Sequence, residues 1–258
     1  MQTLSRFKAL LAAIAAGVII ATPALAGPVS GQGTWETTLQ ARDLNGDNVT
    51  DAFYDTALNI TWLRDANING RMAWNVANDW ANSLVFGGYA DWRLPILVDT
   101  GPAGCDISYQ GGTDCGYNVQ TATSEMAHLW YVTLGNKGLC SPVTSTPTQC
   151  QIQPGFGLAN TGDFLNMQGA IYWFGIKHVT SYDAYWYFLF DRGTQFVVQP
   201  NERSFAMAVR SGDIISPVPE PGTLALLTLG LAGVGLSRRS GSRLVKCNPP
   251  PLTFRADA

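Results

Sequence analysis

The sequence is poor in the residues from which catalytic and zinc sites are usually built. It contains two histidines, His128 and His178, and no Cys-x-x-Cys pair among its five cysteines. Because protein zinc sites depend heavily on cysteine and histidine ligands, a zinc site is not expected. The chain also lacks the Gly-x-Ser-x-Gly, His-Glu-x-x-His and P-loop motifs. No acid or cysteine is placed by the sequence to form a triad with His128, so we predict a non-catalytic protein.

Lysine is scarce, and basic residues are outnumbered between the two ends of the chain. Residues 27–216 hold nine Lys and Arg against seventeen Asp and Glu, a net charge of −8. An acidic surface does not attract nucleic acid. The segment is long enough for one domain with a sizeable core. Its frequent Gly, Asn, Thr, Trp and Tyr favour a loop-rich secreted fold.

The N-terminus has the three parts of a secretory signal peptide. Arg6 and Lys8 precede an apolar run over residues 9–20, and Ala24-Leu25-Ala26 follows with small residues at the positions that a signal peptidase reads. The alternative is an N-terminal membrane anchor, but the apolar run is too short to span a bilayer. We therefore predict cleavage after Ala26 and export of the chain.

A second apolar run lies near the C-terminus. Pro219-Glu220-Pro221 precedes an uncharged stretch at 223–236, which is a little shorter than the ~20 residues that a membrane span prefers. Arg238 and Arg239 follow it, and basic residues beside a span stay on the cytoplasmic side. The pattern predicts a transmembrane helix that holds the domain outside the inner membrane.

These features, in this order, resemble the PEP-CTERM sorting signal. The resemblance rests on Pro219, Glu220, Pro221, the apolar run, Arg238 and Arg239. An ordinary tail anchor would not need the Pro-Glu-Pro motif. The resemblance implies a Gram-negative host that makes exopolysaccharide, and processing by an exosortase. We expect a precursor anchored in the inner membrane and a mature form at the cell surface or outside the cell.

Four cysteines lie in the predicted exported part: Cys105, Cys115, Cys140 and Cys150. In an oxidising compartment they predict two disulfides. Local pairing, Cys105–Cys115 and Cys140–Cys150, is the simplest of the three possible connectivities. Each bond would close a loop rich in Gly, Pro or Thr.

Hydrophobic periodicity predicts an α+β domain with an antiparallel sheet. Two helices are expected, one over 73–84 that stops at Gly87-Gly88, and one that Thr123 caps and Gly135-Asn136 ends. Strands are expected at 35–40, 52–55, 59–63, 170–177, 184–191, 194–198 and 204–210.

The stretch Gly87-Gly-Tyr-Ala-Asp-Trp-Arg-Leu-Pro95 resembles the signature of the Lcl C-terminal domain family. Residues 61–65 and a helix with Trp74 and Trp80 fit the family upstream, and 184–193 and 206–210 fit its closing strands. The family implies a C-type-lectin-like fold, in which the first and last strands lie side by side, and relatives point to adhesion and glycan binding. The formylglycine-generating enzymes share that fold but need cysteines late in the domain, and none lies between Cys150 and Cys247.

The predicted organisation has six parts. They are a signal peptide at 1–26, N-terminal strands and an acidic turn at 27–60, an Lcl C-terminal-like domain at 61–212, a linker with the Pro-Glu-Pro motif at 213–222, a transmembrane sorting helix with its arginines at 223–240, and an unexplained tail at 241–258. Insertions at 99–122 and 140–157 depart from the family pattern.

Dense aromatic residues are the candidates for sugar binding: Tyr182, Tyr185, Trp186 and Trp173. Exposed Trp and Tyr stack on sugar rings. The alternative is core packing, because alternate residues of a strand point inward, and it is favoured for all but Tyr182, which lies in a loop. For Arg93 we favour a structural ion pair with Asp91 or Glu125 over contact with a ligand.

An acidic turn matches part of a calcium loop. Asp43, Asn45, Asp47 and Asp51 stand at positions 1, 3, 5 and 9, but Asn48 and Tyr54 replace the expected Gly and Glu. Calcium is therefore weighed against a solvated Asp/Asn turn.

Together these patterns predict an exported, exosortase-sorted surface or matrix protein with a non-catalytic lectin-like domain that binds extracellular polysaccharide or mediates adhesion. The alternatives are a structural matrix protein without a ligand and an enzyme acting on envelope polymers. The lectin motifs Glu-Pro-Asn and Trp-Asn-Asp are absent, so calcium-bridged sugar binding of the usual kind is not expected.

Overall fold

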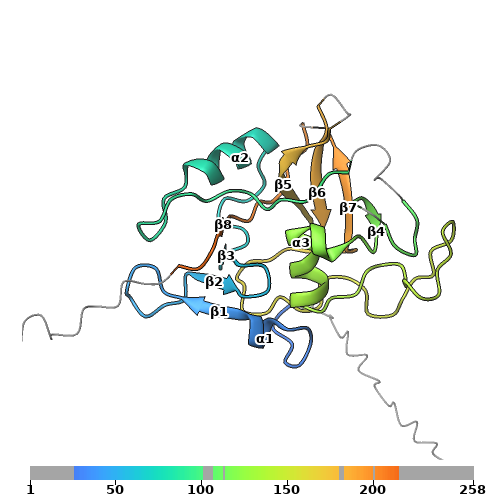
Figure 1. The fold of residues 1–258 in the computed structure, drawn as a ribbon, viewed down its shortest axis with the longest axis horizontal. Coiled ribbons are helices and arrows are strands. Elements are labelled where there is room, and N and C mark those ends of the chain that lie inside the picture. The colour runs from blue at the N-terminus through green and yellow to red at the C-terminus, as the bar shows by residue number, and fades with distance from the viewer. Residues whose placement is uncertain (1–25, 101–106, 113, 180–182, 200, 215–258) are drawn as a thin grey trace, which may run out of the picture.

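The computed structural model describes residues 26–214, apart from 101–106, 113, 180–182 and 200. In this part the chain forms two four-stranded antiparallel sheets with short helices beside them (Figure 1). This arrangement agrees with the predicted α+β class. The predicted signal peptide (1–26, except its last residue), sorting helix (223–240) and tail (241–258) lie outside the described residues. Among the residues that are described, no helix is long and apolar enough to cross a membrane.

The first sheet joins the two ends of the domain. It contains β1 (Leu39–Arg42), β2 (Ala52–Asp55), β3 (Ile60–Leu63) and β8 (Val209–Ser211), in the order β1-β2-β3-β8. The predicted hairpin of β2 and β3 is present, with Phe53 opposite Trp62. β3 and β8, which lie near the two ends of the 61–212 region, pair antiparallel.

The second sheet contains β4 (Gly116–Tyr117), β5 (Ile171–Lys177), β6 (Tyr185–Leu189) and β7 (Thr194–Val198), in the order β4-β7-β6-β5. The three longer strands confirm the strands predicted at 170–177, 184–191 and 194–198. Gly193 makes the turn between β6 and β7 with φ 66°, and an added Cβ would collide with the ring of Trp130. Only glycine suits this turn, because L side chains rarely adopt such a φ.

The helices are short. They are α1 (Trp35–Thr38), α2 (Trp74–Ser83), the 3₁₀ turn η1 (Thr121–Thr123), α3 (Glu125–Ala127) and the π-helical segment η2 (His128–Thr133) that continues α3. α2 confirms the helix predicted over 73–84. The predicted cap of the second helix is wrong by one residue. The Ser124 hydroxyl, not that of Thr123, accepts the N–H of Ala127, because Thr123 belongs to the preceding turn.

Two strand predictions need correction at their bounds. Residues 35–38 form a helical turn instead of the start of a strand, and β1 begins at Leu39. The hydroxyls of Thr37 and Thr38 both donate to the carbonyl of Thr34, and such local bonds compete with strand pairing. The closing strand predicted at 204–210 is only Val209–Ser211, since Ser204 and Phe205 make single bridges to Met72 and Tyr172.

Aromatic side chains fill the core between the sheets and the α3–η2 helix. Trp62, Trp130, Trp173 and Trp186 are each 0% exposed. Burying an indole leaves its N–H in need of an acceptor. Trp130 Nε1 donates to Phe190 O at 2.9 Å, and Trp173 Nε1 donates to Met72 O at 2.9 Å. Tryptophan therefore links the elements by hydrogen bonds as well as by packing.

Candidate functional site

Three of the four aromatic residues predicted to bind sugar belong to the core. Trp173 and Trp186 are fully buried, and Tyr185 is 7% exposed. A sugar ring can stack only on an exposed face, so these residues are corrected from ligand contacts to packing residues. Consecutive residues of β5 (172–174) and of β6 (185 and 186) are buried, and neighbouring strand residues point to opposite faces, so both faces of the sheet are covered here. Tyr182, the loop candidate, lies outside the described residues.

The ring of Tyr185 is covered by two neighbours. The ring of Trp74 stacks on it with a centroid distance of 4.1 Å and an interplanar angle of 29°. The ammonium of Lys177 lies 5.2 Å from its centroid, within the range of a cation–π contact. Trp74 is itself fixed, since its Nε1 donates to Phe174 O at 2.7 Å. The stacked pair therefore forms a rigid wall.

An open groove of about 660 Å³ lies beside this wall. It runs between α2 and the segment that follows β7, and its lining residues are Ala73, Asn75, Val76, Tyr185, Asn201 and Arg203. Asn75, Asn201 and Arg203 are exposed, so their amide and guanidinium groups face solvent. We call this feature the Arg203 groove.

A smaller depression of about 280 Å³ shares Arg203 with the groove. Arg71, Asp191 and Glu202 are among its other lining residues. Burial raises the pKa of the Asp191 carboxyl, and the charge of Arg192 only partly opposes the effect. The cations Arg71, Arg203 and Lys177 thus lie in or next to these two hollows of an otherwise acidic domain.

Our sequence reasoning missed the Arg203 groove. Asn75 and Val76 lie on the exposed side of α2, and Asn201 and Arg203 follow β7, so more than 120 residues separate the two halves. No motif marks either half. The only available signal was Arg203 itself, one of nine basic residues in residues 27–216.

Arg93 has the structural role that the sequence favoured. Its Nη1 and Nη2 donate to Oε2 and Oε1 of Glu125 at 2.8 and 2.7 Å. Glu125 Oε2 also accepts the backbone N–H of Ile96 at 2.8 Å. This bidentate pair ties the Trp-Arg-Leu-Pro segment to the start of α3.

The acidic turn is closed by its own side chains. The carboxylate of Asp43 accepts the N–H groups of Asn45, Gly46 and Asn48, and Asp51 accepts that of Leu44. Burial opposes ionisation of Asp43, but these backbone bonds outweigh it and lower the pKa of its carboxyl. Across the described residues, no group of three or more His, Cys, Asp or Glu side chains is placed to hold a metal ion. Calcium at Asp43, Asn45, Asp47 and Asp51 stays a prediction from spacing.

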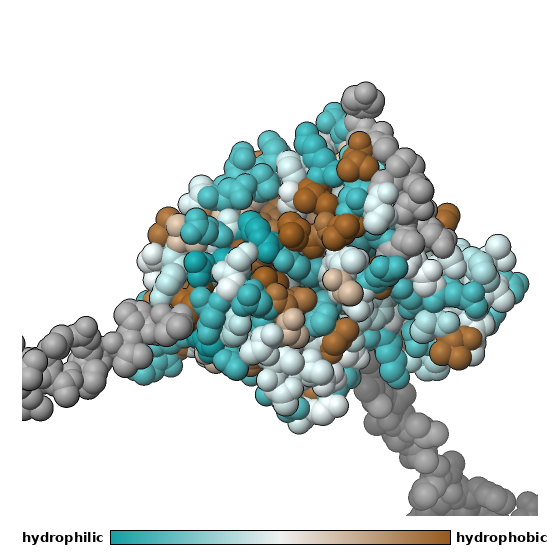
Figure 2. All heavy atoms as spheres, viewed as in Figure 1, coloured by the Kyte–Doolittle hydropathy of each residue, from teal (hydrophilic) through white to brown (hydrophobic). Residues whose placement is uncertain are grey.

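The two insertions pack against each other to form one lobe. Asn118 Nδ2 donates to the carbonyls of Tyr109 and Cys140, at 2.9 and 3.1 Å, and so joins them. The Cys140–Cys150 disulfide predicted from the sequence is present, with its Cα atoms 5.1 Å apart. Cys115 is also disulfide-bonded, and Cys105, its predicted partner, lies outside the described residues. Figure 2 shows apolar groups interspersed with polar residues on the viewed face, this lobe included.

Replacing Cys140 and Cys150 together by serine should destabilise the domain by roughly 2–3 kcal/mol. The bond closes a short loop, with a sequence separation of 10, and restricts it in the unfolded chain. Urea unfolding of the exported domain measures the loss, with Thr148→Ser in the same loop as the control. An unchanged midpoint, or free thiols at both positions in exported protein, would contradict the prediction.

The comparisons with known proteins identify one segment. No curated protein and no solved structure matches the chain. The resemblance to the Lcl C-terminal family and to C-type lectins finds no support there. Residues 217–239 match the model of the PEP-CTERM protein-sorting motif. This motif marks the chain as an exported surface protein that an exosortase-type enzyme processes at the membrane.

Proposed function

We propose that the exported domain is a non-catalytic module that binds an acidic extracellular polysaccharide in the Arg203 groove. The observation that carries the proposal is the position of the cations. In a segment with a net charge of −8, Arg203 and Lys177 lie at or beside one groove, together with the exposed amides of Asn75 and Asn201. The PEP-CTERM motif supports a location of the mature protein at the cell surface or in the polysaccharide matrix.

The chemistry of the groove suits a charged sugar. A guanidinium group pairs with a carboxylate through two parallel hydrogen bonds, and amide groups donate to and accept from hydroxyls. The Trp74–Tyr185 wall offers a rigid edge, although its stacked faces are not free. The groove is open, so few contacts are made with each sugar unit and binding should be weak.

A further point favours a binding role over an enzymatic one. The sequence contains no catalytic motif that places an acid and a base together. A structural matrix protein without a ligand remains the alternative.

Titration of the purified domain with the host's own exopolysaccharide tests the proposal. We expect the double variant Asn75→Ala, Arg203→Ala to lose most of the binding, because both halves of the groove lose a polar contact. Lys137→Ala is the matched control, since Lys137 is an exposed cation that does not line the groove. Binding by the wild type should also weaken as salt screens the charges.

Three results would exclude this function. Absence of binding by the wild type would favour a structural matrix protein. Equal loss in the groove variant and in Lys137→Ala would indicate unspecific attraction to positive charge. New reducing ends in the incubated polysaccharide would identify an enzyme instead.

A further inference from the structure

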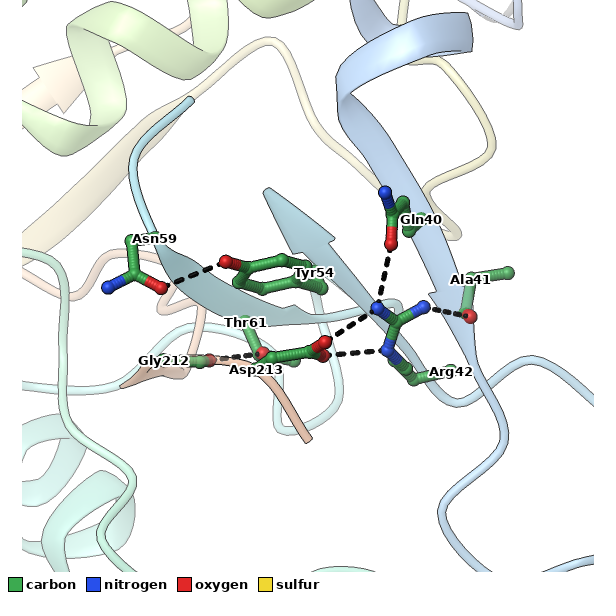
Figure 3. A network of polar contacts seen from close by, with 8 residues as sticks. All are labelled: Gln40, Ala41, Arg42, Tyr54, Asn59, Thr61, Gly212 and Asp213. Carbon is green, nitrogen blue, oxygen red and sulfur yellow. Dashed lines mark hydrogen bonds and ion pairs between the residues drawn. The ribbon is translucent and has the colours of Figure 1, made fainter. Parts of the chain in front are cut away.

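The C-terminal end of the folded domain is fastened to the first sheet (Figure 3). The N–H of Gly212 donates to Asn59 O at 2.8 Å, and the hydroxyl of Thr61 donates to Gly212 O at 2.8 Å. Asp213 pairs with Arg42 through two bonds, from Nε to Oδ1 at 2.7 Å and from Nη2 to Oδ2 at 2.8 Å. We call these five residues the terminal clasp.

The clasp is firm because Arg42 is held from several sides. Its guanidinium also donates to Ala41 O and to Gln40 Oε1, and lies over the ring of Tyr54 at 5.4 Å. The hydrogen bonds from Arg42 lower the pKa of the Asp213 carboxyl. Both partners are therefore charged at neutral pH, and the pair persists where the exported protein works.

Ile214, the last residue that the structure describes, directly follows the clasp. Ile214 is 1% exposed and packs in a buried cluster with Leu44, Leu63 and Trp92. The sorting motif begins at residue 217, and Pro219 is the fifth residue after Ile214. Five fully extended residues span at most about 18 Å. A folded domain therefore lies within that distance of any enzyme that binds the Pro-Glu-Pro segment.

The packing of Leu44 places the β1–β2 loop next to the C-terminal end of the described domain. Leu44 anchors this loop, residues 43–51, beside Ile214 in the same buried cluster. In Figure 1 the β1–β2 loop and the end of β8 lie on the left of the molecule, whereas the insertion lobe lies on the right. We call the loop together with the terminal clasp the clasp face.

From this short tether we infer that the clasp face is the surface that contacts the membrane-embedded sorting enzyme while the Pro-Glu-Pro segment is bound. The partner is a protein surface rather than lipid, because the loop carries Asp43, Asp47 and Asp51. A membrane with anionic lipids attracts basic segments and would repel such a loop. The enzyme surface that faces the loop should accordingly be basic or polar.

Site-specific photo-crosslinking in the full-length chain, expressed in its native host, tests the inference. The crosslinking residue replaces Ser211 or Val49, both exposed on the clasp face, and Val49 is 52% exposed. Val143 and Ile152, which are 85% and 67% exposed in the insertion lobe, are the matched controls. We expect adducts with the sorting enzyme from the first two positions and none from the controls. Cleavage of each variant near the Pro-Glu-Pro segment is measured in the same samples, and it shows that the variant is bound by the sorting enzyme.

A flexible insert of ~20 Gly and Ser residues after Ile214 provides the second arm, because such a linker lets the domain move away from the enzyme. The adducts from Ser211 and Val49 should then be lost, although every clasp contact is kept. Equal adducts from both ends of the domain would overturn the inference. So would adducts with lipid alone, or adducts that the insert leaves unchanged.

Discussion

Replacing Pro219, Glu220 and Pro221 together by alanine is expected to leave the chain uncut and in the inner membrane. Because proline cannot continue a helix, the sequence predicts an extended segment in front of the apolar run. The charge of Glu220 is costly to bury, so we expect that segment to stay in water. Alanine at the three positions would remove both effects. Fractionation with an antibody to the domain, followed by mass spectrometry of its C-terminus, measures the result.

The wild-type chain should be cut close to the Pro-Glu-Pro segment, and its domain should leave the inner membrane. Pro249→Ala is the matched control, because Pro249 lies beyond the matched residues 217–239 and should not affect cutting. Mature wild-type protein that still carries Leu236 and stays in the inner membrane would show that the segment is a plain anchor.

Glu125→Ala should destabilise the domain by about 2–3 kcal/mol, the range for hydrogen bonds to charged groups. The change removes both bonds to Arg93 and the acceptor of the Ile96 N–H. The side chains of Arg93 and Glu125 are 26% and 14% exposed, so water replaces the lost partner only in part. Urea unfolding of the purified domain measures the loss as a lower midpoint with an unchanged slope.

Glu125→Gln separates charge from hydrogen bonding at the same position. The amide oxygen can accept from Ile96 or from Arg93 but lacks the charge, so we expect a loss between those of the wild type and Glu125→Ala. Glu202→Ala is the control for loss of an exposed carboxylate and should shift stability by less than about 0.5 kcal/mol. A wild-type midpoint for Glu125→Ala would mean that the ion pair does not fasten the Trp-Arg-Leu-Pro segment.

The elements that the sequence predicted correctly are those whose structure is set by residues close to one another in the chain. The β2–β3 hairpin, α2 and the three strands of the second sheet followed from residue periodicity, which records which side of an element faces the core. The strand expected at 35–40 was wrong over residues 35–38, and the reason is local too. The threonines suit a strand, but their hydroxyls bond back to Thr34 and favour a helical turn.

The sequence by itself determined the PEP-CTERM sorting motif, because a sorting motif is a linear segment that can be recognised without folding. The N-terminal signal peptide stays a prediction from the sequence. The sequence also predicted the α+β class and, as the simplest of three connectivities, the Cys140–Cys150 pairing, whose partners are ten positions apart. Only the tertiary structure decided which aromatic residues are exposed, where Arg203 meets α2, and how tightly the chain is fastened before the sorting motif. Each of these depends on contacts between residues more than 80 positions apart, such as Trp186 with Asp99 and Arg42 with Asp213. Tertiary packing determines which side chains are buried and which charges lie together at such sites, and the local pattern of residues does not predict this packing.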